Sequence, residues 1–247
     1  MQENSALGRA LEVVRDLRNR CPWDRVQTRD TLRPYLVEEV LELDAALREN
    51  DLGKIRDEMG DFLLHLAWQL TLAGELGEFT PGDIAEDLER KMRRRHPHLY
   101  DIGPPEPWEQ LKRKEKRSGI VDGLPETLPS LAMAYRLQQR AASVGFDWPD
   151  TSGPRDKVRE ELAEVESELD EGGEKLADEI GDLLFAVVNL ARKAAVDPGL
   201  ALDRANLKFR RRFAEVERLA AEKGLEVEQA GLEKLDELWN EAKQRER

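Results

Sequence analysis

Residues 157–190 read KVREELAEVESELDEGGEKLADEIGDLLFAVVNL, and this stretch decides the fold class. Before the glycine pair at 172–173, apolar residues recur at three- and four-residue spacing, as on an amphipathic helix: Val158, Leu162, Val165 and Leu169. After the glycines, the apolar residues between Leu183 and Leu190 occupy nearly the whole circumference of a helix, so we expect this second helix to be largely buried. The sequence therefore predicts a helical hairpin closed by a two-glycine turn.

Four acidic residues of this hairpin are placed to converge. Glu161 and Glu164 are three positions apart, which makes them neighbours on one side of the first helix. Glu179 and Asp182 have the same spacing on the second helix, and Asn189 shares their side. Carboxylates gathered between helices require a compensating cation. Oxygen ligands without His or Cys favour a hard ion, so we expect Mg²⁺, with Mn²⁺ as the alternative.

The same pattern occurs earlier in the chain. The counterparts in the first copy are Glu39, Glu42, Glu58 and Asp61. Sixteen positions separate the second acid from the third in this copy, against fifteen in the other. Each copy continues into a basic helix with a lysine and an arginine four apart, Lys91 and Arg95 in the first and Lys208 and Arg212 in the second. An internal repeat of this kind predicts two tandem helical bundles.

The basic helices supply the positive charge that a phosphate ligand needs. Lys208 and Arg212 lie on one helix face and can reach phosphate oxygens. Asn206 adds a neutral polar group, whereas the first copy has Glu89 there and so places a negative charge near a polyphosphate. We therefore expect the second copy to be the main active site, with the first weaker, differently selective or structural.

Helical spacing extends over nearly the whole chain. Besides the hairpin, expected as residues 155–171 and 174–195, helices are predicted around residues 7–17, 31–48, 54–76, 83–95, 128–144, 200–222 and 231–247. Residues 101–127 differ, because they are rich in proline and include the basic run KRKEKR at 112–117. The prediction is an all-α protein with an N-terminal helical domain (1–100), a Pro-rich and basic connector (101–127) and a C-terminal helical domain (128–247).

Composition and charge limit the classes of partner. The chain has 247 residues and a formal net charge of −13, so binding to DNA or to a membrane is not expected. The single cysteine, Cys21, excludes an intrachain disulfide and fits the reducing cytoplasm. The longest apolar stretch, residues 183–191, is too short for a bilayer, which takes about 20 residues. The N-terminal residues lack the apolar region of a signal peptide.

Other interpretations of the acidic pattern stay open. A single Glu-x-x-Glu is usually a solvated helix face, and acids beside Lys or Arg mostly form surface ion pairs. A di-iron site needs Glu-x-x-His pairs, and no histidine follows His98. Helical enzymes of prenyl diphosphates need an aromatic-lined apolar pocket, whose signature is lacking. A regulatory dimer that senses a nucleotide without turnover fits the same residues. Packing is the simpler explanation for His65, which the second copy replaces by Ala186, and for Trp239, for which base stacking is the alternative.

Several motifs together resemble the MazG family of nucleoside triphosphate pyrophosphohydrolases in its two-repeat form. They are CPWDRVQT (21–28), the two EExxE … ExGD blocks, RRHPH (94–98), ASVGFDW (142–148) and NLKFRRRF (206–213). The resemblance implies all-α bundles that pair into a homodimer. It also implies Mg²⁺-dependent hydrolysis of the α–β bond of nucleoside triphosphates to a monophosphate and pyrophosphate, for house-cleaning of the nucleotide pool.

The resemblance also implies roles for individual residues. The metal ligands would be Glu161, Glu164, Glu179 and Asp182, with Glu161 or Glu164 also handling the attacking water. The nucleotide contacts would be Lys157, Glu160, Lys208 and Arg212, with Asn206 beside them and Trp239 near the nucleotide. The first copy would offer Glu39, Glu42, Glu58, Asp61, Lys91 and Arg95 in the same roles.

Overall fold

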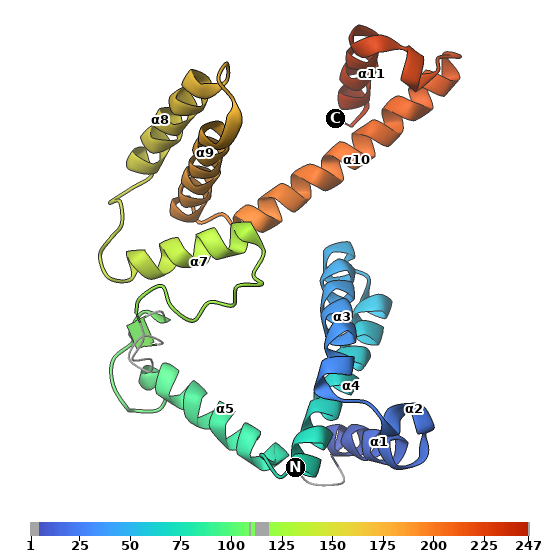
Figure 1. Cartoon of the computed structure of the whole chain (residues 1–247), viewed down its shortest axis with the longest axis vertical. Coiled ribbons are helices and arrows are strands. Elements are labelled where there is room, and N and C mark those ends of the chain that lie inside the picture. Colours follow the sequence, from blue (N-terminus) through green and yellow to red (C-terminus); the bar gives the residue numbers. More distant parts are fainter. Residues whose placement is uncertain (1–4, 109, 112–118, 247) are drawn as a thin grey trace. The chain divides into compact units, whose positions relative to one another are not determined.

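A computed structural model describes residues 5–108, 110–111 and 119–246, and the chain divides into two units, Met1–Glu106 and Pro107–Arg247. Within the described ranges every regular element is a helix (Figure 1), so the expectation of an all-α chain is confirmed. The basic run at 112–117 lies outside the described residues.

Unit 1 is built around a pair of long helices. Its elements are α1 (Ala6–Arg20), α2 (Pro22–Arg25), α3 (Arg29–Glu49), α4 (Leu52–Leu76), α5 (Pro81–Arg95) and the 3₁₀ helix η1 (Pro97–Leu99). Helices α3 and α4 form an antiparallel hairpin, and α1 packs across α4 (Figure 1). This hairpin carries the first set of acids.

Local side-chain chemistry sets the ends of this hairpin. Thr28 caps α3, and its side chain and that of Thr31 exchange hydrogen bonds with each other's backbone amides. Asn50 turns the chain with a φ of 54°, a conformation that asparagine tolerates better than most residues. Asp51 then caps α4 by accepting hydrogen bonds from the Gly53 and Lys54 amides. Because of the Thr28 cap, α3 begins two residues before the predicted start.

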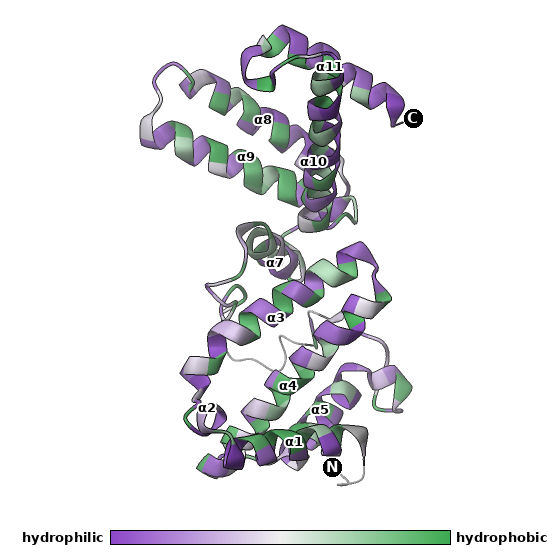
Figure 2. Ribbon diagram, turned by 90° about the vertical axis from the view of Figure 1, so that its right-hand side faces the viewer, coloured by the Kyte–Doolittle hydropathy of each residue, from purple (hydrophilic) through white to green (hydrophobic). Residues whose placement is uncertain are grey.

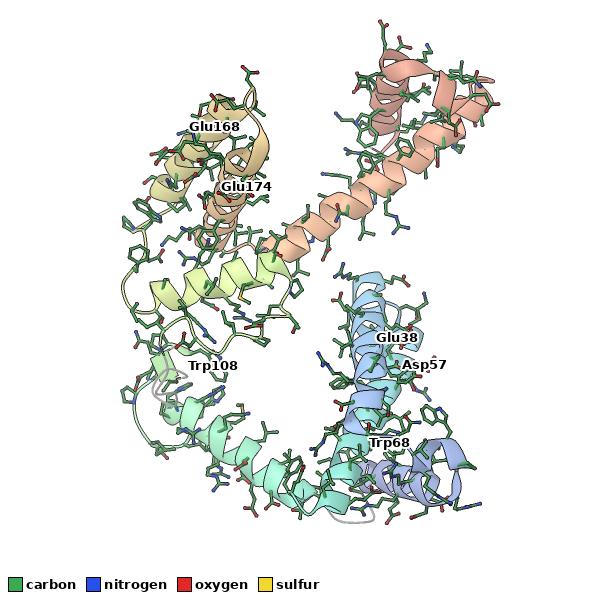
Figure 3. The ribbon with its side chains drawn as sticks, viewed as in Figure 1. Glu38, Asp57, Trp68, Trp108, Glu168 and Glu174 are labelled. Atoms are coloured by element: carbon green, nitrogen blue, oxygen red, sulfur yellow. The ribbon has the colours of Figure 1, made fainter. Side chains whose placement is uncertain are left out.

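The core of unit 1 lies where α1 crosses α4. Its buried members are Leu11, Val14, Leu32, Ala67, Trp68, Leu70 and Leu72. Figure 3 labels Trp68 at this crossing, and the side chain is only 3% exposed. The guanidinium of Arg18 on α1 lies over the indole at 5.8 Å from the ring centroid. The indole therefore fills the space between the two helices.

Unit 2 repeats the hairpin and adds a second helix pair. Its elements are α7 (Ser130–Ala142), α8 (Ser152–Glu168), α9 (Gly173–Lys193), α10 (Pro198–Glu222), the 3₁₀ helix η2 (Val227–Gln229) and α11 (Gly231–Arg245). Helices α8 and α9 lie side by side, and α7 packs on α9 as α1 packs on α4. Leu219 and Leu238 are completely buried between α10 and α11.

The two-glycine turn is confirmed. Gly172 and Gly173 have φ values of 67° and 80°, in the left-handed region where a side chain is strained. The pair therefore lets α9 return directly along α8. Helix α8 ends at Glu168 rather than at the expected residue 171, because the chain leaves the helix before it reaches the glycines.

The expected burial of α9 is wrong for the single chain. Only Ala186 and Val188 are buried on this helix, whereas Leu184 is 55% exposed and Phe185 44%. Figure 2 shows hydrophobic residues along much of α9. The physical reason is that, within unit 2, α9 is contacted mainly by α8 and α7, which cover only part of its circumference.

The total accessible surface area of the chain is also larger than expected for two compact units. The chain exposes 17681 Å², whereas two separately folded units of these masses would expose about 13,500 Å². Among the described residues, exposed apolar side chains such as Leu184 and Phe185 contribute to this excess. None of the helices in the described ranges is long and apolar enough to cross a membrane.

Candidate active site

Three acids meet between α8 and α9. Carboxylate oxygens of Glu161, Glu164 and Glu179 all lie within 4.8 Å of one another. Glu161 is only 4% exposed, so its charge is held away from bulk water. Asp182, one turn beyond Glu179, is exposed and is not part of this three-residue group. The hairpin thus gathers three of the four expected ligands and leaves the fourth at the edge.

Lys157 is the cation of this cluster. Its Nζ lies 2.5 Å from Oε1 of Glu161 and 2.8 Å from Oε1 of Glu160. The hydrogen bonds that Lys157 donates to Glu160 and Glu161 raise the pKa of Lys157, and Lys157 in turn holds the pKa of Glu161 below its usual range. Glu164 has a raised pKa, because it shares a hydrogen bond with Glu161 and is repelled by nearby acids. Glu161 is therefore the ionised member of the pair, and Glu164 holds a proton more tightly.

The acids of unit 1 also form a cluster, but it includes Asp61, the counterpart of Asp182, and not Glu42, the counterpart of Glu164. Carboxylate oxygens of Glu39, Glu58 and Asp61 lie within 4.8 Å of one another. Burial is the largest cause that raises the pKa of Glu39, followed by repulsion from Asp61. Glu58 also has a raised pKa, through burial first and then Glu42, with which it shares a hydrogen bond. Figure 3 shows that the labelled Glu38 and Asp57 lie on the two helices of this hairpin.

The two clusters differ in their counter-ion. The position four residues before the buried glutamate is Lys157 in unit 2 and Tyr35 in unit 1. The acids of unit 1 therefore lack the intrahelical lysine that compensates Glu161. In unit 1 the nearest imidazole is that of His65, whose Nε2 lies 3.9 Å from Oε1 of Glu39. Burial lowers the pKa of His65, so this histidine is neutral near pH 7 and does not replace the lysine.

The basic residues of α10 lie apart from these acids. Arg212 forms an ion pair with Glu246, 2.6 Å away, and lies over the Trp239 ring at 5.8 Å from its centroid. Trp239 also packs against Phe209, with 5.3 Å between ring centroids. In the described part of the chain no ion pair joins Lys208 or Arg212 to the carboxylates of α8 and α9. Asn206 is exposed on the same helix.

The corresponding residues of unit 1 lie on α5. Lys91 and Arg95 are on this helix, which contacts η1 and has no buried residue. Glu89, the residue that replaces Asn206, forms an ion pair with Arg93 at 2.7 Å. The negative charge of Glu89 is therefore partly compensated on its own helix. This weakens the argument that Glu89 would repel a polyphosphate bound to unit 1.

Sequence reasoning did not find the counter-ion role of Lys157. The resemblance offered Lys157 only as a phosphate contact. The signal was present, because a lysine four residues before a glutamate is a standard helical ion pair. What the spacing alone could not supply is the burial of Glu161, which makes this pair different from the exposed ones around it.

Comparison with known protein families matches both copies of the repeat. A family model described as the MazG nucleotide pyrophosphohydrolase domain matches residues 27–100 and 155–216. The acids of both clusters lie within these two segments, whereas Trp239 lies beyond them.

Relatives match over most of the chain. A Thermotoga maritima protein named nucleoside triphosphate pyrophosphohydrolase/pyrophosphatase MazG is 42% identical over 90% of this chain and 89% of its own length. The nucleoside triphosphate pyrophosphohydrolase of Escherichia coli K12 is 40% identical over 96% of this chain and 95% of its own. An uncharacterised Bacillus subtilis protein, YabN, is 42% identical over 95% of this chain, which corresponds to 51% of that protein.

Proposed function

The chain belongs to the MazG nucleotide pyrophosphohydrolase family, and from that premise we propose that it hydrolyses the α–β bond of nucleoside triphosphates with Mg²⁺. It is a nucleoside triphosphate pyrophosphohydrolase, like the relatives that match it over 90% and 96% of its length. In the proposed reaction, one water is consumed and a nucleoside monophosphate and pyrophosphate are released. House-cleaning of the nucleotide pool is the role that we propose for this activity.

The acid cluster of unit 2 carries the proposal. Three carboxylates whose oxygens lie within 4.8 Å of one another, one of them almost fully buried, fit a hard divalent cation better than any organic group. Glu161, Glu164 and Glu179 would hold Mg²⁺ or Mn²⁺, with Asp182 joining from the edge. The cation would supply electrostatic stabilisation of phosphate oxygens and a more acidic water.

The side chains of the hairpin would then have distinct tasks. Glu161 or Glu164 would orient the attacking water and accept its proton, since both carboxylates lie in the acid cluster. Lys157 is shared between Glu160 and Glu161, so it can turn to a phosphate oxygen without losing all its partners. Lys208 and Arg212, with Asn206 beside them, would stabilise charge on the leaving pyrophosphate. Trp239 would position the guanidinium that lies over its ring.

We also propose that the protein acts as a homodimer, with the basic helix of one copy completing the acid cluster of the other. Two observations support this: α9 exposes Leu184 and Phe185, and neither Lys208 nor Arg212 pairs with the acids of α8 and α9 in the described part of the same chain. Exposed apolar helix faces are typical of surfaces that associate.

Product analysis tests the reaction. The protein is incubated with each nucleoside triphosphate and Mg²⁺, and the phosphorus products are identified by ³¹P NMR. Pyrophosphate and a monophosphate are expected. Orthophosphate and a diphosphate would refute α–β cleavage, and tight binding without turnover would support a nucleotide-sensing dimer instead.

Two further comparisons test the site and the dimer. Glu164→Ala should abolish most activity, whereas the matched change Glu42→Ala in unit 1 should leave most of it; the reverse result would move the main site to unit 1. Mixing inactive Glu164→Ala with inactive Lys208→Ala should restore about a quarter of the wild-type rate, because half of the random dimers regain one intact site. A mixture that stays inactive would contradict completion by a second copy.

A further inference from the structure

One histidine of unit 1 is buried beside the acid cluster. His65 lies on α4 and is only 5% exposed. In the described part of the chain its buried Nδ1 has no hydrogen-bond partner, and its Nε2 lies 3.9 Å from Oε1 of Glu39, beyond hydrogen-bond distance. A polar group that is buried without a partner destabilises the fold. Packing alone therefore does not account for an imidazole at this position.

The imidazole adds a nitrogen to a group of carboxylates. Asp61 and His65 are four residues apart on α4, so their side chains lie one turn apart on the same face, and Glu39 reaches this face from α3. Two ligands that each lie about 2.1 Å from one ion can be up to about 4.2 Å apart. The 3.9 Å between Nε2 of His65 and Oε1 of Glu39 is within that span. One cation can thus contact both atoms.

The cluster of unit 2 has neither this nitrogen nor this freedom. The residue four positions after the last acid of the hairpin is Ala186, which is buried and offers no ligand atom. The buried glutamate of unit 2, Glu161, already has the ammonium of Lys157 at 2.5 Å. An ammonium competes with a metal ion for a carboxylate, whereas a neutral imidazole supplies a lone pair to the ion. The two clusters therefore differ in the ion that suits them.

The kind of donor atom selects the ion. Mg²⁺ takes oxygen ligands, demands near-ideal octahedral geometry and keeps several of its waters. Imidazole nitrogen suits the later first-row transition ions, which also accept carboxylates. A cluster of three carboxylates and one imidazole is thus a mixed nitrogen and oxygen site, and it favours an ion such as Zn²⁺ or Co²⁺ over Mg²⁺.

We propose that unit 1 binds a divalent transition ion such as Zn²⁺ or Co²⁺ in preference to Mg²⁺, with His65 as its nitrogen ligand. The oxygen ligands are the carboxylates whose oxygens lie within 4.8 Å of one another, those of Glu39, Glu58 and Asp61. The two halves of the chain then hold different ions. This assignment concerns ion binding alone, so it does not rest on the proposed hydrolysis.

Proton NMR of the full chain with Co²⁺ tests the nitrogen ligand directly. A histidine bound to Co²⁺ gives a strongly shifted imidazole N–H signal that disappears in D₂O. The changes Glu164→Ala and Glu179→Ala, made together, remove two acids of the unit 2 cluster and leave unit 1 intact. One such signal is expected in this background, and it should be absent after His65→Ala, which copies Ala186 of unit 2.

Calorimetric titration in the same background measures the preference between ions. Zn²⁺ should bind more tightly than Mg²⁺. Losing even an outer partner of a metal ligand costs about 10–100-fold in affinity, so loss of the ligand itself should weaken Zn²⁺ binding at least about tenfold. Mg²⁺ affinity should change little, because Mg²⁺ does not need the nitrogen. His65→Phe keeps a ring in the buried space and should give the same result as His65→Ala.

The other histidines serve as the internal control. The chain has three histidines, and the remaining two are His96 and His98. The shifted signal should persist after His96→Ala and His98→Ala together, which assigns it to His65 even if neither variant of that residue folds.

Four results would overturn the assignment. These are the absence of a shifted N–H signal at saturating Co²⁺, a signal that survives both changes of His65, a signal that is lost with His96 and His98, and tighter binding of Mg²⁺ than of Zn²⁺ in unit 1. The third result would indicate an adventitious ion only.

Discussion

Replacing Lys157 by methionine removes the cation that lies among the acids of α8 while keeping an unbranched side chain. Lys157 is 2.5 Å from Glu161, and the two side chains are 43% and 6% exposed. Breaking a fully buried pair costs about 3–5 kcal/mol, because a charge is left uncompensated. A fully exposed pair contributes about 0.2–1 kcal/mol. With one partner buried and the other open to solvent, we expect a loss of about 1–3 kcal/mol.

Calorimetry of the full chain in EDTA measures this loss. For a unit of this size, it corresponds to a fall of about 3–10 °C in Tm. The matched control is Arg159→Met, which breaks a 2.8 Å pair with Asp156 on the same helix, where the side chains are 67% and 62% exposed. That change should cost less than about 1 kcal/mol.

Lys157→Met should strengthen the binding of Mg²⁺ and weaken the binding of the nucleotide. Without nucleotide, Mg²⁺ affinity measured by titration calorimetry should increase, because Lys157 no longer competes for Glu161. With nucleotide, KM should rise, because the phosphate contact that we propose for Lys157 is lost. An unchanged Tm in Lys157→Met would refute the reasoning. So would an equal fall in Tm when Lys157→Met is made in a Glu161→Gln background, because the cost of losing the lysine must disappear once Glu161 carries no charge.

Three other changes give independent tests. Burial and neighbouring acids raise the pKa of Glu39. The protonated carboxyl therefore stabilises the metal-free fold at low pH, and that stability is lost as pH rises through the raised pKa. Glu39→Gln should raise Tm in EDTA at pH 7, and the gain should vanish towards pH 4. Arg192 lowers the pKa of Asp147. The ionised carboxylate therefore stabilises the fold at pH 7, and that stabilisation is lost as pH falls through the lowered pKa. Asp147→Asn should reduce the free energy of unfolding in urea by about 1–3 kcal/mol at pH 7, and by progressively less below pH 4. Leu238→Ala should cost about 2–5 kcal/mol in thermal unfolding, because this side chain is completely buried, and Mg²⁺ affinity should stay unchanged.

The helices were predictable because their signals are local. Apolar spacing and the glycine pair at 172–173 lie within a few residues of the structure that they determine. Helix ends were less accurate where the cap was not considered, as at Arg29. The association of acids on α8 and α9 was also accessible, since the spacing of Glu161 and Glu164 fixes their relative direction on a helix.

What the sequence could not supply depends on contacts between distant residues. The apolar character of α9 was evident, but not the exposure of Leu184 and Phe185, because hydropathy does not identify which neighbours cover a helix. Likewise, Asn189 was recognised as polar on the acidic side of α9. The structure shows that it lines a cavity together with Gln138, which comes from another helix.

The lysine in the second acid cluster also affects the order of events during biosynthesis. Because Lys157 already compensates Glu161, unit 2 can fold on leaving the ribosome without waiting for a divalent ion. The ion can then be delivered later, as the companion of an incoming triphosphate. The cluster around Glu39 has Tyr35 in that position and keeps its repulsion until an ion or a proton arrives. Chelation in a growing cell should therefore delay maturation of the first half of the chain more than that of the second.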